Sequence, residues 1–451
     1  MAKAFIPLLS HMPRMMKDWH EKLKIIGVIA PILAFIVAFF VFVLRRPDII
    51  MNPQFWAEDG SRWFQRVLDL GVIKSLFIPE AGYFQTVSKI TMGIATLIPL
   101  KYAPLFSNMV ALSIRAAPAL FLFSKRMSFV PWVSRCLILL YYVLMPNLWE
   151  VHANITNSFW YLSLYLFMTI IATAPNSRWW KIHDYCLLLL SGLSSITIIF
   201  MAPCYIMKLW TQCDMRVPEG GGQTFSSKLQ AMLGRLLTPY SITYFLICLI
   251  QGGALILTGD ATRVSMSLGL ADIVVSNILS SRVFLGSFLP NAWVSVIWDQ
   301  HFLNYTITII SLVGLIFLLR RGDFRIRGLI IFAAATLLAA LARPAISMTE
   351  PQLPLLRDAF CGGRYFIIPC IAWFCVVLKL SYHLPVYLRR ISHVIILSAV
   401  LWMGGKSFTI PPLIDMRFGE YVKKYEDLDK GQHITIPINP GDGWKIEMTK
   451  R

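Results

Sequence analysis

Long apolar stretches divide the sequence, and this feature limits the chain to folds that a membrane can hold. The first stretch, residues 25–44, has about 20 apolar residues, enough for a helix to cross ~30 Å of hydrocarbon at ~1.5 Å per residue. It is too long for a signal-peptide core, and no small-residue cleavage site follows it. Hydrophobic residues make up 57% of the chain, whereas soluble domains contain about 45–50%. We therefore predict an all-α polytopic integral membrane protein.

Basic residues at the ends of the apolar stretches indicate how the chain crosses the membrane. The N-terminal segment is rich in lysine and arginine, so the positive-inside rule places it in the cytoplasm. Residues 84–100 are only moderately apolar and are expected to lie in the membrane interface. We predict about eleven transmembrane crossings with the C-terminal tail outside. The predicted spans are residues 25–44, 103–124, 129–145, 159–173, 185–210 as an interrupted pair, 240–257, 305–319, 329–341, 365–380 and 391–403.

The chain divides into a membrane domain and a short tail. The membrane domain is residues 1–405, with a first outer loop at residues 45–102, and the tail is residues 406–451. A segment of about 40 residues buries too little surface to fold alone, so the tail is expected to pack on the outer loops. Its alternating residues 434–440, followed by Gly441 and Gly443, predict a short strand or hairpin, which Pro437 would keep at a sheet edge.

Charge and cysteine content exclude two other classes. The net charge is +18, but the basic residues stand in short groups at the ends of spans rather than in one stripe, so no nucleic-acid partner is expected. Most of the eight cysteines fall within apolar stretches, so no disulfide framework is expected. The partners that remain are membrane lipid and lipid-borne or surface molecules.

Polar residues gather in the segments predicted to lie outside, beginning with Glu58 and Asp59 in the first loop. Trp56 and Trp63 flank this pair and would hold it at the headgroup level. A carboxylate can act as general base on a hydroxyl, while guanidinium groups, alone or with a divalent metal, stabilise a departing phosphate. Alternatively, the two acids cap the helix that begins near Gly60.

Two arginines, Arg115 and Arg135, fall inside predicted spans. Charge is costly there, so a functional or partnered role is expected for both. Arg364 follows two glycines at the mouth of a span, where it could equally be a membrane-interface anchor.

Several short motifs resemble one family. They are Phe55-Trp-Ala-Glu-Asp-Gly60, Leu76-Phe-Ile-Pro79, Gly82-Tyr83, Asn157-Ser-Phe-Trp160, Gly363-Arg-Tyr365, Ile438-Asn-Pro440 and Gly443-Trp444. With these motifs the chain resembles bacterial multi-span glycosyltransferases of the GT-C superfamily, and within them the Gtr-type glucosyltransferases of bacteria and temperate phages that modify O-antigen. The sharpest motif covers only the first loop.

The resemblance implies a GT-C-like bundle in the bacterial inner membrane with a periplasmic active site. It implies an undecaprenyl-phosphate sugar as donor, and it leaves open whether a divalent metal takes part. Glucose is the favoured sugar and the O-antigen of lipopolysaccharide the favoured acceptor, with inversion at the anomeric carbon and, as partners, a donor synthase and a flippase. Carried onto this sequence, it makes Asp59 the first candidate for the base and Glu58 the second. The expected substrate-binding residues are Tyr83, Glu150, His152, Asn157, Arg282, Arg343, Arg364 and Tyr365.

Two other functions remain open from the sequence. A lipid-linked oligosaccharide flippase or other transporter would also have many spans, but it would place charges near the middle of the bundle and often repeat its halves. An O-antigen polymerase or ligase would share the donor chemistry and is expected to use a large, arginine-rich outer loop. No internal repeat is visible here, and the loops are only modestly rich in arginine.

Overall fold

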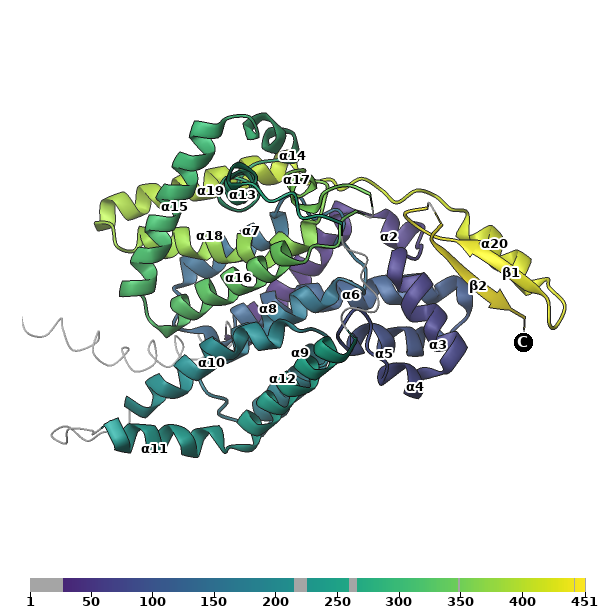
Figure 1. Ribbon diagram of the computed structural model, residues 1–451, viewed down its shortest axis with the longest axis horizontal. Coiled ribbons are helices and arrows are strands. Elements are labelled where there is room, and N and C mark those ends of the chain that lie inside the picture. The colour runs from purple at the N-terminus through teal and green to yellow at the C-terminus, as the bar shows by residue number, and fades with distance from the viewer. Residues whose placement is uncertain (1–26, 215–224, 259–265, 348, 442, 451) are drawn as a thin grey trace, which may run out of the picture.

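The computed structural model describes residues 27–214, 225–258, 266–347, 349–441 and 443–450 (Figure 1). The basic N-terminal segment lies outside these ranges, so its cytoplasmic position remains a prediction. Residues 211–238, which the sequence predicts to form a flexible cytoplasmic linker, are described in part, and their glycine-rich stretch at 218–222 lies outside these ranges. Within the described residues the protein is mostly helical and has two short strands, as expected for an all-α membrane protein.

The apolar stretches of the sequence form the long helices. After a first helix over Gly27–Arg45 come α6 (Ala103–Leu122), α7 (Trp132–Leu144), α8 (Ser158–Ile171), α9 (Arg178–Gly192), α10 (Thr197–Asp214), α12 (Pro239–Thr258), α15 (His301–Arg321), α16 (Phe324–Ala342), α18 (Ile367–Ser381) and α19 (Val386–Lys406). Each predicted span overlaps one of these helices, and the interrupted span is the pair α9 and α10. This is the architecture of a multi-pass membrane protein.

Among the described residues, seven helices are long and apolar enough to cross a membrane, so the predicted count of eleven is not confirmed. α7 and α8 are also apolar, but they have 13 and 14 residues. At ~1.5 Å per residue, helices of this length fall short of ~30 Å of hydrocarbon. All 14 residues of α8 are buried, which makes it the centre of the bundle.

Local signals explain why α16 begins five residues earlier than the apolar pattern predicts. The Asp323 side chain accepts hydrogen bonds from the backbone N–H groups of Arg325 and Ile326, at 3.0 and 3.1 Å. These are N–H groups that a helix start leaves without an intrahelical partner. Two of the basic residues at this end of the bundle, Arg325 and Arg327, therefore lie at the start of α16.

The break between α9 and α10 is covered by the first outer loop. The backbone N–H of Val87 donates to the Ser194 hydroxyl at 2.9 Å, and the Thr86 hydroxyl donates to the carbonyl of Leu193 at 2.9 Å. Non-helical backbone within a membrane bundle needs partners of this kind. The predicted interruption of this span is therefore confirmed, and α5 protects the broken backbone.

The first outer loop is itself helical. It contains α2 (Asp48–Met51), a π-helical turn (Asp59–Phe64), α3 (Gln65–Leu70), α4 (Val72–Leu76) and α5 (Thr86–Ala95). α5 lies in the segment predicted to be interfacial, and it is a short helix with most of its residues buried against neighbouring elements. Phe77 and Leu97, by contrast, are 74% and 81% exposed. An interfacial position for this apolar edge stays a prediction.

The later outer segments also contain short helices that the apolar pattern does not reveal. These are α13 (Asp272–Ile278), a π-helical turn (Leu279–Phe284), α14 (Asn291–Val294), α17 (Gln352–Leu355) and a 3-10 turn (Gly363–Phe366), while α11 (Phe225–Leu236) precedes α12. The eight cysteines are all free.

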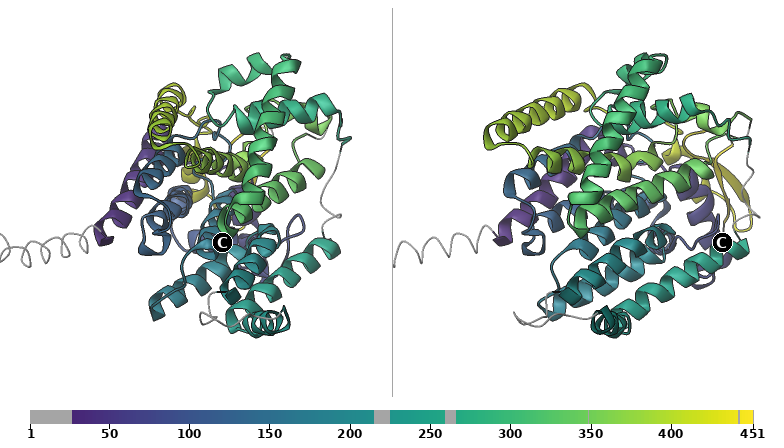
Figure 2. Two further views of the ribbon diagram at one scale, coloured as in Figure 1. Left: turned by 90° about the vertical axis from the view of Figure 1, so that its left-hand side faces the viewer. Right: turned by 60° about the vertical axis from the view of Figure 1, so that its left-hand side comes forward.

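The C-terminal tail contains α20 (Phe418–Glu426) and the predicted hairpin, formed by β1 (His433–Pro437) and β2 (Lys445–Thr449). The strands are antiparallel, with Ile436 opposite Ile446. Figure 1 shows the hairpin at the same end of the molecule as α3, α4 and α5, and the right-hand view of Figure 2 agrees.

The tail shares a hydrophobic core with the first outer loop, separate from the main core of the bundle. Phe55, Trp63 and Phe64 of the loop meet Ile438 and Ile446 of the tail in this cluster. Gly60 allows the close approach, because a Cβ there would lie 2.6 Å from Cδ1 of Ile438. The tail therefore packs on the loop of residues 45–102 as predicted, and this loop completes the core of the tail.

Candidate functional site

A cavity of about 830 Å³ lies where the first outer loop, the tail and the ends of several long helices meet. The start of α8, the end of α16 and the start of α18 all contribute, so the cavity is at one end of the bundle. Seven of the predicted site residues line it: Glu58, Tyr83, Glu150, Asn157, Arg343, Arg364 and Tyr365. Three others, Asp59, His152 and Arg282, are not among its lining residues.

An unusual backbone conformation sets the position of Glu58. Ala57 has a φ of +32°, which is costly for alanine. The tail holds this conformation, because the backbone N–H of Ala57 donates to the carbonyl of Asn439 at 2.6 Å, and the N–H of Asn439 donates to the carbonyl of Phe55 at 3.3 Å. Glu58 follows directly and is half-buried at the cavity wall. The Arg364 guanidinium lines the same cavity, within electrostatic range of Glu58.

Asp59 faces away from the cavity and is 1% exposed. Its two carboxylate oxygens accept hydrogen bonds from the backbone N–H groups of Ile155 and Thr156, at 2.9 and 2.8 Å. Burial raises the pKa of Asp59 to about 8, although the two hydrogen bonds oppose this shift. Neither acid of the pair caps the π-helical turn through its side chain. Asp59 therefore fastens the first outer loop to the segment before α8.

Arg364 is held in the cavity wall by several groups. Its guanidinium forms an ion pair with Glu150 and donates to the carbonyl of Ala345. Its backbone N–H donates to Glu150 at 3.4 Å. The preceding Gly363 packs against the chain, since a Cβ there would lie 2.9 Å from the carbonyl oxygen of Asn147. Arg364 is thus oriented before any ligand binds.

Arg62 and Glu80 also line the cavity, although Arg62 is not among the predicted site residues. Arg62 lies 3.7 Å from a carboxylate oxygen of Glu80, and Arg66 lies 2.5 Å from the other. Nearby, burial and then the charge of Arg66 lower the pKa of Lys89 to about 8. Arg62 follows Glu58 by four residues, and residues at this spacing share one side of a helix. The sequence spacing therefore offers a signal that Arg62 faces the same side as Glu58.

Aromatic side chains form much of the rest of the cavity wall. Trp56, Trp160 and Trp444 come from the first outer loop, α8 and the tail. Tyr83 meets Phe159 edge to face, with ring centroids 5.8 Å apart. Ligand cavities commonly combine such rings with a few placed polar groups. The wall therefore offers apolar faces between its charged groups.

His152 lies in a different, buried cluster. Its Nδ1 is 2.7 Å from Nη1 of Arg115, and its Nε2 is 2.9 Å from the carbonyl oxygen of Phe42. Burial and then the charge of Arg115 hold the pKa of His152 well below its usual value. The Arg115 guanidinium stacks on Phe42, 4.0 Å from the ring centroid. His152 thus partners a buried arginine of the bundle, outside the cavity.

Arg282 and Arg135 bind backbone carbonyls. Arg282 donates to the carbonyls of Leu356 and Cys361, at 2.6 and 3.0 Å, and so secures the segment before Arg364. Arg135 donates to the carbonyls of Val130 and Met127, at 2.8 and 2.7 Å. Both arginines are therefore partnered by the backbone, as costly charges in a bundle require.

In the part of the chain that the structure describes, no group of three or more His, Cys, Asp or Glu side chains could hold a metal ion. The carboxylates at the cavity are instead set among guanidinium groups, as in the Glu150–Arg364 pair. We therefore derive no chemical step through a metal.

No protein-family model matches the chain, and neither does any curated protein or solved structure. Helices and cavity together define a class: a multi-pass membrane protein with a charged, aromatic-lined cavity at one end of its bundle. Function must be argued from this cavity.

Proposed function

We propose that the protein is a polyprenyl-phosphate-sugar-dependent glycosyltransferase of the bacterial inner membrane. It transfers a hexose, with glucose favoured by the resemblance, to a periplasmic glycan such as O-antigen. The observation that carries the proposal is that Glu58 and Arg364 line one cavity at the end of the bundle. We place the N-terminus in the cytoplasm and the cavity in the periplasm. The proposed count of about eleven crossings includes the shorter helices α7 to α10, around which the bilayer would be locally thinner.

The proposed reaction is a direct displacement. Glu58 takes the proton of an acceptor hydroxyl, and that oxygen forms a bond to the anomeric carbon from the face opposite the phosphate. The bond between the anomeric carbon and the phosphate oxygen breaks, so the product has inverted configuration. The bonding electron pair leaves with polyprenyl phosphate, whose charge Arg364 stabilises.

Glu58 is preferred to Asp59 as the base because of the surroundings of the two carboxylates. Both oxygens of Asp59 already accept backbone hydrogen bonds, and its side chain is buried behind the cavity wall. Glu58 lines the cavity and makes no hydrogen bond through its side chain within the described residues. A general base must reach the proton that it takes.

The alternative functions use the cavity differently. A flippase or transporter is expected to carry its charged groups near the middle of the bundle, whereas Arg343 and Arg364 stand at the ends of α16 and α18. A polymerase or ligase would use the same donor chemistry but would join whole glycan units. The transferase, polymerase or ligase, and transporter therefore differ in how they change the glycan at the cell surface.

The test is mass spectrometry of lipopolysaccharide from cells that express the wild-type chain and supply lipid-linked glucose. We expect one added hexose per modified unit with the wild-type chain and loss of that hexose with Glu58→Gln. The matched control is Glu350→Gln, which makes the same change at an exposed acid that does not line the cavity. Equal loss in a well-inserted Glu350→Gln variant would remove the assignment of Glu58.

The same spectra distinguish the classes. Altered O-antigen chain length without a new hexose would favour the polymerase, and lost surface export would favour the transporter. Retained transfer in Glu58→Gln together with loss in Asp59→Asn would move the base to Asp59. An added hexose that persists in both variants would overturn the general-base mechanism.

A further inference from the structure

A second cavity, of about 300 Å³, lies within the bundle at the end opposite the charged cavity. Two helices, α8 and α16, contribute to both cavities with opposite ends. The start of α8 lines the first cavity and its last turns line the second, while the end of α16 lines the first cavity and its start lines the second. α18 lines the second cavity, and the 3-10 turn that precedes it lines the first. The second cavity is therefore separate from the proposed catalytic site and lies near the other surface of the membrane.

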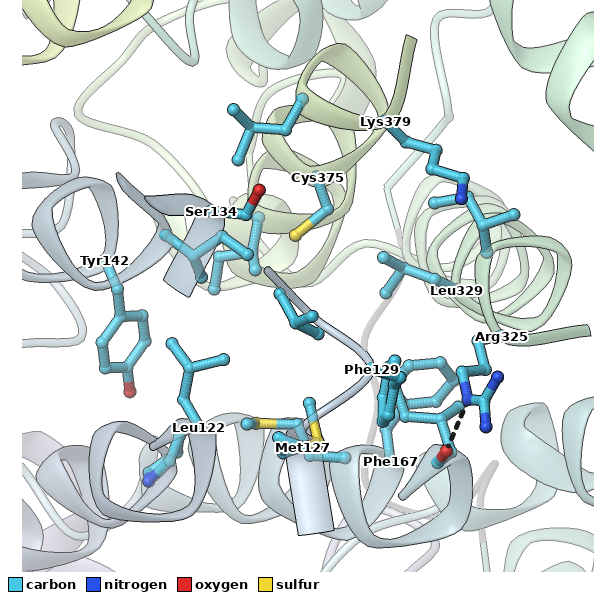
Figure 3. A pocket seen from close by; sticks show the side chains of 18 of the residues that line it. Leu122, Met127, Phe129, Ser134, Tyr142, Phe167, Arg325, Leu329, Cys375 and Lys379 are labelled. Atoms are coloured by element: carbon cyan, nitrogen blue, oxygen red, sulfur yellow. Dashed lines mark hydrogen bonds between the residues drawn. The ribbon is translucent and has the colours of Figure 1, made fainter. Parts of the chain in front are cut away.

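The wall of this second cavity is almost entirely apolar. Figure 3 shows Leu122, Met127, Phe167 and Leu329 around a shared space. Its few polar groups already have partners: the Ser134 and Tyr382 hydroxyls are 2.8 Å apart. The Tyr142 hydroxyl likewise donates to the carbonyl of Arg115 at 2.6 Å. A wall of this kind offers water few hydrogen bonds, so it suits a hydrocarbon chain.

The opening of the cavity is basic. Figure 3 shows the Lys379 ammonium and the Arg325 guanidinium on the same side, across the cavity from Tyr142. Within the described ranges, the Lys379 side chain makes no hydrogen bond or ion pair, and it is half-buried. Arg325 is aligned by stacking on Phe129, with its guanidinium carbon 4.2 Å from the ring centroid. Its Nε donates to the carbonyl of Ile171 at 3.1 Å, and its Nη1 lies 3.9 Å from a carboxylate oxygen of Asp323, which also lines the cavity.

Acidic groups near the opening are few and engaged. Asp184 is held by Arg126 through two contacts of 2.6 and 2.9 Å. Asp323 is exposed and caps α16 through the N–H groups of Arg325 and Ile326. Asp323 offsets the charge of Arg325 across 3.9 Å, so the net positive charge at the opening is that of Lys379. An apolar cavity beneath a basic opening is complementary to a molecule with a hydrocarbon tail and an anionic head.

We propose that this cavity is a binding site for an anionic phospholipid. One acyl chain enters the space between α7, α16 and α18, and the phosphate is held by Lys379 and Arg325. The site binds a lipid of the surrounding bilayer and takes no part in the proposed sugar transfer, so either proposal can fail without the other.

Native mass spectrometry of the delipidated full chain tests the site. Phosphatidylglycerol is compared with phosphatidylcholine of the same acyl chains. We expect the anionic lipid to bind about fivefold more tightly, as one or two membrane-surface cations allow, and Lys379→Gln to remove that preference. Arg321→Gln is the matched control, because this exposed cation ends α15 and does not line the cavity. Equal binding of both lipids to the wild-type chain, or equal effects of the two variants, would overturn the proposal.

Two further measurements locate the lipid. A phosphatidylglycerol with a photoreactive group at the end of one acyl chain should label peptides of residues 118–139 and 322–329, and Leu329→Trp should block this labelling by filling the cavity. Labelling confined to exposed outer helices would count against an internal site. Inorganic phosphate should not displace the lipid, and displacement would make this a phosphate site instead.

Discussion

The carboxylate of Asp59 accepts a hydrogen bond from the backbone N–H of Thr156 at 2.8 Å, across 97 positions of the sequence. Together with the bond from Ile155, this contact joins the first outer loop to the segment that leads into α8. It turns Asp59 into the protein and leaves its neighbour Glu58 at the cavity. Two adjacent acids thereby acquire different surroundings, and different roles are expected for them.

Asp59 is expected to make the protein less stable as the pH rises. Burial raises its pKa in the folded protein to about 8, from an ordinary value of 3.8. Above about pH 4 the unfolded chain has lost this proton, so folding takes one up. The stability that is fully present at lower pH is therefore lost as the pH rises through about 8, by at most about 1.4 kcal/mol per unit. We expect Tm to fall between about pH 5 and about pH 8.

Asp59→Asn should flatten this dependence, because the replacement cannot ionise. The control is Asp69→Asn, at an exposed acid of the same loop, which should retain the slope of the wild type. Thermal melting in detergent over this pH range measures both variants. Parallel curves for wild type and Asp59→Asn would show that another group causes the dependence.

The ion pair of Glu150 with Arg364 should contribute more to stability than the pair of Glu447 with His433. The Glu150 side chain is 11% exposed, whereas that of Glu447 is 36% exposed and its partner 55%. Glu150→Gln should cost about 2 kcal/mol, because a partly desolvated guanidinium loses its counter-charge. Glu447→Gln, in an exposed pair, should cost less than about 1 kcal/mol. Chemical denaturation in mixed micelles measures the free energy of unfolding of both variants. A larger loss for Glu447→Gln than for Glu150→Gln would show that burial does not set the strength of these pairs.

Packing between the tail and the first outer loop should be essential for stability of that end of the molecule. Ile446 is fully buried, so Ile446→Ala should cost about 2–5 kcal/mol through lost contacts and a new cavity. Ile414→Ala makes the same change in the tail at a residue that is 63% exposed, and its cost should be below about 0.5 kcal/mol. Thermal melting separates the two, and similar values would mean that the shared core contributes little.

Gly363→Ala should displace Arg364. The added Cβ would lie 2.9 Å from the carbonyl oxygen of Asn147, which as a backbone atom cannot move freely. We expect reduced sugar transfer, by about tenfold or more, as small displacements of positioning groups commonly cause. Gly405→Ala is the control, because no heavy atom lies within 4 Å of the added Cβ. Transfer by Gly363→Ala at the wild-type rate would show that the position of Arg364 is not critical.

Much of the helical architecture could be predicted from the sequence because it depends on local pattern. An apolar stretch long enough to cross hydrocarbon forms a helix whichever neighbours it meets. The helix ends were less predictable: α16 begins at Phe324 because Asp323 caps it, not because apolar residues begin there. The hairpin of the tail was also predictable, from its alternation and its glycines.

The candidate site could be predicted in part for the same reason. Glu150, Arg343 and Arg364 stand beside the ends of spans, so topology alone places them on one side of the bundle, and the structure brings them to one cavity. His152 and Arg282 occur in equally polar segments, yet the structure turns them into buried contacts with Arg115 and with backbone carbonyls. Nothing in their local sequence separates these outcomes.

The sequence by itself determined the class of protein, most of its helices and the side of the bundle on which its polar residues gather. Only the tertiary structure decided that Glu58, rather than Asp59, faces the cavity. The physical reason is that the direction of each side chain depends on segments far along the chain. Asn439 holds Ala57 at a positive φ, and the N–H groups before α8 bind the neighbouring carboxylate. Such contacts exist only after distant parts of the chain have packed together.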